Sequence, residues 1–231
     1  MRPRRKGKRR EEPWVIYSRG EDIFYMILHI VSAVLAAGIL TIAVVFTALD
    51  YSWQSVLSAA VYGSAMLIVH ILLSIYHGLP YGIGKDVMYI VARNILYIFF
   101  VGTAMAVNFI SREPLTGENQ DIVCLLFGVI GIFVVTGIVF TSISMERFHI
   151  LVLICYFMTI WLMIVPSIMG IRSLNHTGMF LLIGGNIGYT VCGVCRLKGD
   201  EYAFPRIMKK ISFYAGTALH FACVMVCILL P

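Results

Sequence analysis

Charged side chains are scarce in this sequence. Only 13% of its 231 residues are Asp, Glu, Lys or Arg, whereas soluble domains carry about 25%. Hydrophobic residues make up 60% of the chain, and the mean hydropathy is +0.89. Segments this apolar do not divide into separate soluble cores, so we expect one domain, embedded in lipid.

Several common signals are also missing. No second cysteine pair or neighbouring histidine accompanies Cys192 and Cys195, so this C-x-x-C is weak evidence for a zinc or redox site. All six cysteines lie in or beside apolar runs, as buried thiols usually do. The first apolar run is too long for a signal peptide, and no small-residue cleavage site follows it.

The net charge of +6 does not indicate a nucleic-acid partner. Lys and Arg are spread between apolar runs and are not gathered on one soluble module. A basic cluster does occupy the polar segment 1–22. We interpret this segment as a cytoplasmic tail, where each basic residue near an anionic lipid surface contributes about 1 kcal/mol. The remaining residues, 23–231, are expected to form the membrane domain.

Seven apolar runs follow the tail. Each reaches the roughly 20 residues that a helix needs to cross about 30 Å of hydrocarbon. Helices are required there because unpaired backbone groups are too costly in lipid. The sequence therefore predicts an all-α, multi-pass protein of the cell membrane, a bundle of seven transmembrane helices. The expected spans lie at 24–48, 55–76, 87–110, 122–141, 149–169, 177–195 and 211–230.

The distribution of Lys and Arg predicts the orientation. With the N-terminus in the cytoplasm, fifteen of the eighteen Lys and Arg residues fall on the cytoplasmic side. Only Arg112 and Arg172 fall outside, and Arg93 lies within the third span. Because cytoplasmic loops are enriched in Lys and Arg, this excess predicts a cytoplasmic N-terminus. Seven spans then place the C-terminus outside.

Ionisable residues within the spans are candidate functional groups, because burying them in lipid is costly. His70, Ser74 and His77 share one face of the second helix by their spacing. With the predicted orientation, His77 and Arg93 lie on the cytoplasmic side. Arg206 and Lys210, four residues apart at the start of the seventh span, lie there too.

Several motifs resemble those of one family, in the same order along the chain. The run from Gly20 to His29 resembles its G-E-E-I-x-N-x-x-T-H motif, and Ser74-Ile-Tyr-His77 resembles its L-Y-H motif. The family is haemolysin III together with the adiponectin and progestin receptor group (PAQR). The resemblance continues through Tyr97 with Gly102-Thr103, Gly137–Phe140, Tyr156 with Trp161, Gly184-Gly185 with Tyr189-Thr190, and Gly216–Phe221.

The resemblance implies a seven-helix bundle similar to membrane hydrolases of the alkaline ceramidase type. It also implies a zinc site near the cytoplasm, with one His at the end of helix two and an H-x-x-x-H at the start of helix seven. A Ser in helix two and an Asp in helix three complete the pattern. In this sequence His77 stands at the helix-two position, Leu73 at the Ser, Ala92 at the Asp, and Arg206 and Lys210 at the H-x-x-x-H.

These replacements remove most of the metal ligands. A catalytic zinc needs about three protein ligands and an open position, and His77 is the sole matching ligand here. Arginine has no lone pair to offer, and Lys210 would have to lose its proton beside other cations. We therefore assign no catalytic residue and expect no cofactor, with zinc expected only if the ligand positions are misaligned.

The basic residues suggest a different use. Arg93, Arg206 and Lys210 are predicted to form a cationic pocket at the inner leaflet, together with His77. Such a pocket either binds an anionic lipid headgroup or is neutralised by the protein's own carboxylates. The acidic residues expected at that depth are Glu21, Asp22 and Asp86.

Three functions remain open from the sequence. The first is a non-catalytic haemolysin III-like membrane protein that acts as a lipid-binding, sensing or channel-like component. The second is a zinc-dependent lipid amide hydrolase similar to ceramidases. The third is a pore-forming cytolysin, which is the least supported because polar groups within the spans form no continuous stripe.

The predicted orientation is directly testable with reporter fusions. A reporter that is active only outside the cytoplasm should be active after Pro231, because seven spans separate the two ends of the chain. The same reporter before Met1 should be inactive, because the basic N-terminal segment stays in the cytoplasm. The reverse pattern would contradict the orientation.

Overall fold

The protein is entirely helical over the residues that the structure describes. This computed structural model describes residues 17–230 except 112–114, 145–146, 172–173 and 198–202. The basic cluster of the N-terminal segment lies outside the described residues. The helices are α1 (Arg19–Asp50), α2 (Trp53–Gly78), α3 (Ile83–Phe109), α4 (Gly117–Ser144), α5 (His149–Leu162), α6 (Val165–Ile168), α7 (His176–Leu197) and α8 (Ala203–Leu229).

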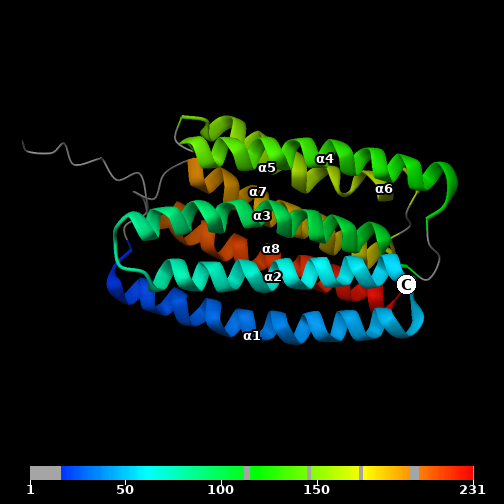
Figure 1. Ribbon diagram of the computed structural model, residues 1–231, viewed down its shortest axis with the longest axis horizontal. Helices are drawn as coiled ribbons and strands as arrows, with labels where there is room; N and C mark the ends of the chain where they lie inside the picture. Colours follow the sequence, from blue (N-terminus) through cyan, green and yellow to red (C-terminus); the bar gives the residue numbers. More distant parts are fainter. Residues whose placement is uncertain (1–16, 112–114, 145–146, 172–173, 198–202, 231) are drawn as a thin grey trace, which may run out of the picture.

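The long helices run roughly along one axis and form a bundle (Figure 1). α1 packs on α2, α2 on α3, α4 on α5 and α7 on α8. α8 lies behind α2 and α3 in Figure 1 and also contacts α1 and α3. α1 and α8 therefore meet although they stand at opposite ends of the sequence.

Within the part of the chain that the structure describes, seven helical segments are long and apolar enough to cross a membrane, which confirms the predicted seven-helix membrane bundle. The fifth span, His149–Ile168, combines α5 and α6. It is interrupted after Leu162, and Pro166 lies in the first turn of α6. Proline has no N–H to donate and its ring clashes with the preceding helical turn, so the interruption lies just before it.

α1 begins earlier than the apolar run at 24–48 indicates. Its N-cap is Ser18, whose hydroxyl accepts a hydrogen bond from the backbone N–H of Glu21 at 3.2 Å. The Glu21 carboxylate in turn accepts one from the N–H of Ser18 at 2.9 Å. This capping box satisfies two N–H groups at the helix end. It places Asp22, within the segment interpreted as a tail, in the first turn of α1.

Close packing of α7 on α8 depends on two glycines. A Cβ atom added to Gly188 would lie 3.1 Å from the Cα atom of Gly216 and 3.1 Å from the carbonyl oxygen of Ser212. Both of these neighbours are backbone atoms, so they cannot move aside as a flexible side chain would. Small residues allow two membrane helices to approach this closely.

We predict that Gly188→Ala lowers the free energy of unfolding by about 1–3 kcal/mol, the usual cost of overpacking. Thermal unfolding in detergent measures the effect. Gly128→Ala in α4 is the matched control, because an added Cβ there meets no heavy atom within 4 Å. A Gly188→Ala variant as stable as the wild type would contradict the close approach.

Candidate functional site

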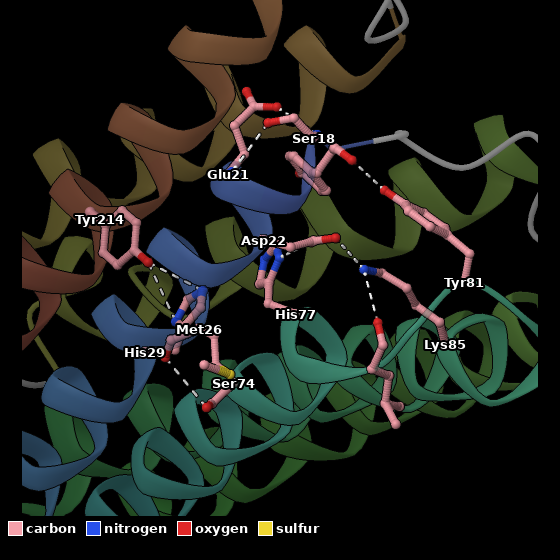
Figure 2. A network of polar contacts seen from close by, with 12 residues as sticks. Ser18, Glu21, Asp22, Met26, His29, Ser74, His77, Tyr81, Lys85 and Tyr214 are labelled. Carbon is pink, nitrogen blue, oxygen red and sulfur yellow. Dashed lines mark hydrogen bonds and ion pairs between the residues drawn. The ribbon is translucent and has the colours of Figure 1, made fainter.

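A buried carboxylate links three helices at the end of the bundle where α1 begins. Asp22 of α1 lies between His77, near the end of α2, and Lys85, in the first turn of α3 (Figure 2). Its Oδ1 accepts a hydrogen bond from Nδ1 of His77 at 2.9 Å, and its Oδ2 accepts one from Nζ of Lys85 at 2.6 Å. All three side chains are at most 10% exposed.

Aromatic rings surround both partners of Asp22. The His77 ring lies 4.8 Å from the ring of Tyr76 and 5.2 Å from that of Tyr17, between ring centroids. The ammonium of Lys85 lies 4.5 Å from the centroid of the Tyr81 ring. These rings exclude water from the ion pair, which strengthens its attraction and raises the cost of losing one partner.

A second polar cluster lies next to His77, between α1, α2 and α8. Nδ1 of His29 on α1 lies 3.1 Å from Nδ1 of His70 on α2, and they share a hydrogen bond. The hydroxyl of Tyr214 on α8 lies 3.1 Å from Nε2 of His29 (Figure 2). The His29 ring also stacks on that of His77, with centroids 5.7 Å apart. This cluster joins α1, α2 and α8. The stacking of His29 on His77 connects it to the ion pair of Asp22.

A cavity of about 100 Å³ opens beside these residues. Among the described residues, its walls come from the six helices α1, α2, α3, α5, α7 and α8, and from Tyr17, which precedes α1. The residues that line it are Tyr17, Tyr25, His29, Leu73, Tyr76, His77, Tyr89, Ala92, Arg93, Leu96, Tyr156, Cys192, Arg196, Lys209, Lys210, Phe213 and Tyr214. We call this cavity with its lining the basic pocket. Its described lining contains four Lys or Arg side chains and no carboxylate.

The four basic side chains lie against aromatic rings or are buried. Nζ of Lys210 lies 3.4 Å from the centroid of the Tyr25 ring and 4.3 Å from that of Tyr17. Lys209, its neighbour on α8, is only 8% exposed. Cation–π contacts of this kind hold ammonium groups without neutralising their charge.

Two guanidinium groups share the ring of Tyr89. The guanidinium of Arg93, also on α3, lies 5.3 Å from the ring centroid. That of Arg196, from the end of α7, lies 5.6 Å from it and donates a hydrogen bond to the Tyr89 hydroxyl. Neither arginine forms an ion pair with a carboxylate among the described residues. Tyr89 therefore holds two positive charges at one wall of the basic pocket.

The structure brings together most of the residues that the sequence singled out. His77, Arg93 and Lys210 all line the basic pocket. So do Leu73 and Ala92, which stand at the family's Ser and Asp positions. α8 contains Arg206, but its side chain lies outside the described residues.

Sequence reasoning missed the aromatic walls and two of the cations. Arg196 and Lys209 entered only as loop charges that set the orientation, although both line the basic pocket. Tyr89 and Tyr25 were not considered at all. The sequence did contain a signal for them. Tyr89 stands four residues before Arg93, and Tyr25 stands three residues after Asp22, so each shares a helix face with a charged residue. These segments were predicted to converge at one edge of the membrane.

The residues present do not fit the zinc site that the family resemblance implies. No group of three or more His, Cys, Asp or Glu side chains among the described residues is arranged to hold a metal ion. At the pocket, Leu73 and Ala92 offer no donor atom, and Nδ1 of His77 is already bound to Asp22. Cys192 lines the pocket, but His77 does not join it in a metal-binding group.

Two known proteins are similar to this chain over nearly its whole length. Hemolysin-3 of Bacillus cereus is 24% identical over 205 residues, which are 89% of this chain and 90% of that protein. A Hemolysin-3 homolog of Bacillus subtilis (strain 168) is 26% identical over 212 residues, 91% of this chain and 96% of the relative. No family model matches the chain. No solved structure matches it either.

We predict that Asp22→Asn lowers the free energy of unfolding by about 3 kcal/mol, because it leaves the buried Lys85 without its counter-charge. Thermal unfolding in detergent measures the loss, and Asp121→Asn at an exposed site on α4 is the control. Adding Lys85→Met to Asp22→Asn should restore part of the stability. Strictly additive effects of the two substitutions would contradict the ion pair.

Proposed function

Since this chain is a divergent member of the haemolysin III family, we propose that it is a non-catalytic component of the cell membrane. In this proposal the basic pocket binds the anionic headgroup of a lipid in the cytoplasmic leaflet. The N-terminus lies in the cytoplasm, so the pocket opens at the level of the inner headgroups. The protein acts by retaining or sensing that lipid.

The observation that carries this proposal is the charge of the basic pocket. Arg93, Arg196, Lys209 and Lys210 line one cavity, and no carboxylate is among its described lining residues. Like charges that line one cavity repel one another, and as a guide a pair ~5 Å apart repels by about 3 kcal/mol at an effective dielectric near 20. An anion in the cavity removes much of that repulsion. Arginine and lysine are also the side chains that commonly bind phosphate groups.

Among the described residues, two carboxylates at this end of the bundle have partners of their own. Asp22 is bound on one oxygen by His77 and on the other by Lys85. Glu21 is bound in the capping box with Ser18. The sequence left open that the protein's own carboxylates pair with the basic residues of the pocket. His77 has such a partner in Asp22, whereas Arg93 and Arg196 contact a tyrosine. A lipid headgroup would supply the carboxylate or phosphate that these arginines lack.

The positions of the replaced residues support a loss of zinc-dependent catalysis. Leu73, His77, Ala92 and Lys210 were matched to the family pattern by sequence alone, and all four line one cavity. Such convergence argues against a misaligned site. Zinc needs about three protein ligands, and of the matched ligand positions only His77 carries an imidazole, so we propose that the family's metal site is degraded in this chain.

We predict that Arg93→Gln lowers the retention of anionic lipid about tenfold, because a hydrogen bond to a charged group contributes about 1.5–3 kcal/mol. Native mass spectrometry of the purified protein, after exposure to phosphatidylglycerol and phosphatidylcholine, measures retention. Arg147→Gln is the matched control, because Arg147 is exposed and lies outside the pocket. Equal retention of the two lipids by the wild type would overturn the proposal.

Metal analysis tests the non-catalytic part of the proposal separately. We expect the purified protein to carry zinc well below one ion per chain, and we expect His77→Ala to leave that amount unchanged. The reason is that Nδ1 of His77 is bound to Asp22, and that α8 contributes Lys210 to the pocket at the position where the resemblance implies a metal-binding His. One zinc per chain, lost in His77→Ala, would favour the lipid amide hydrolase instead.

A further inference from the structure

We propose that Tyr89 is the residue that positions Arg93 and Arg196 to share one bound anion. This inference rests on the proposed binding of an anionic headgroup at the basic pocket, and it adds the means by which two guanidinium groups are held for that headgroup. Tyr89 acts through the two arginines and contributes no charge of its own.

The two arginines come from different helices but lie at the same tyrosine. The guanidinium carbon of Arg93 on α3 lies 5.3 Å from the centroid of the Tyr89 ring, and that of Arg196 on α7 lies 5.6 Å from it. Arg196 also donates a hydrogen bond from Nη2 to the Tyr89 hydroxyl. Among the described residues, neither guanidinium forms an ion pair with a carboxylate. Tyr89 is therefore a contact that these two arginines have in common.

A tyrosine at this position orients an arginine without neutralising it. The ring attracts a guanidinium, and the hydroxyl accepts one of its hydrogen bonds. A guanidinium has five N–H donors, so Arg196 keeps donors for a second acceptor after its bond to Tyr89. A carboxylate in the place of Tyr89 would also hold the arginines, but it would cancel the charge that attracts a ligand. Phosphates and carboxylates accept paired hydrogen bonds from guanidinium groups presented in this way.

Tyr89 is connected to the ion pair of Asp22 through one more ring. The centroid of the Tyr89 ring lies 5.5 Å from that of Tyr76 on α2. The Tyr76 ring in turn lies 4.8 Å from the His77 ring, and Nζ of Lys85 lies 5.1 Å from its centroid. His77 and Lys85 are the two partners of Asp22. A chain of contacts thus runs from this ion pair to the two arginines and reaches them at Tyr89.

Other tyrosines of the pocket have different partners. The hydroxyl of Tyr156 donates a hydrogen bond to the carbonyl of Tyr189 at 3.4 Å, and the hydroxyl of Tyr214 lies 3.1 Å from Nε2 of His29. Tyr89 contacts both guanidinium groups and is therefore the tyrosine to which we assign this role.

Holding the arginines in place before the anion arrives increases the affinity of the pocket. A long side chain loses rotamer freedom when it binds a ligand, and this cost is smaller when the side chain is already ordered. Each arginine that Tyr89 orders in advance should raise the affinity about threefold, and both together about tenfold.

Two substitutions separate the hydroxyl of Tyr89 from its ring. Phosphatidylglycerol and phosphatidylcholine are each titrated against the full chain in detergent, and native mass spectrometry gives the dissociation constants. We expect Tyr89→Phe to weaken the binding of phosphatidylglycerol about threefold, because Arg196 loses its hydrogen bond. Tyr89→Leu should weaken it about tenfold, because both arginines lose the ring. The binding of phosphatidylcholine should not change.

Tyr97→Phe is the matched control for a purely structural effect. Tyr97 lies on the same helix but outside the described lining of the pocket, and its hydroxyl donates a hydrogen bond to the carbonyl of Val152 at 3.0 Å. Both phenylalanine variants lose one hydrogen bond, so both should lose some thermal stability when no lipid is present. Only Tyr89→Phe should weaken the binding of phosphatidylglycerol.

A double-mutant cycle tests whether the hydroxyl acts through Arg196. Arg196→Gln removes the guanidinium that the hydroxyl holds. Adding Tyr89→Phe to Arg196→Gln should therefore weaken the binding of phosphatidylglycerol no further, whereas adding it to Arg93→Gln should still cost about threefold.

The outcomes separate this inference from the proposed function. Unchanged binding in Tyr89→Phe, with the predicted loss in Arg93→Gln, overturns the role of Tyr89 and leaves the proposed function standing. The role is also overturned if Tyr97→Phe weakens binding as much, or if Tyr89→Phe has the same effect with and without Arg196→Gln. Equal binding of the two lipids by the wild type overturns the proposed function and this inference with it. If Tyr89→Leu does not fold, the conservative Tyr89→Phe and its cycle decide.

Discussion

The carboxylate of Asp22 holds three helices together at the end of the bundle that contains the basic pocket. It comes from the first turn of α1 and binds His77 of α2 and Lys85 of α3 at the same time. A buried ion pair gains little over apolar packing, but removing one partner leaves an uncompensated charge. The positions of His77 and of the start of α3, which carries Tyr89 and Arg93, therefore depend on this carboxylate.

The same bridge engages both oxygens of Asp22 with His77 and Lys85. In the neighbouring basic pocket, Arg93 and Lys210 lie against tyrosine rings. A tyrosine ring attracts a cation without cancelling its charge. Within the described lining of the pocket, the Lys and Arg side chains are not accompanied by a carboxylate, which is consistent with the anion binding proposed above.

The membrane spans could be predicted from the sequence because one physical constraint dominates them. Backbone groups in hydrocarbon must be paired within a helix, so an apolar run of sufficient length becomes a helix regardless of local propensity. The pocket was harder to predict because some of its parts, among them Tyr17, Arg196 and Lys209, come from segments interpreted as tail or loop. The Ser18-x-x-Glu21 capping box shows that α1 includes Asp22, and that signal is visible in the sequence. The shared contact of Arg93 and Arg196 with Tyr89 depends on the packing of α3 and α7, which no local pattern encodes.

Two of the residues that differ from the family pattern form apolar parts of the pocket wall. Leu73 and Ala92 line the cavity and add no charge to it. Lys210, at a position where the family has a metal ligand, adds one and rests on Tyr17 and Tyr25. On the function proposed here, the loss of a divalent cation and the gain of fixed cations are linked. In that proposal no divalent cation is present to repel lysine and arginine, and their own charges attract an anion instead.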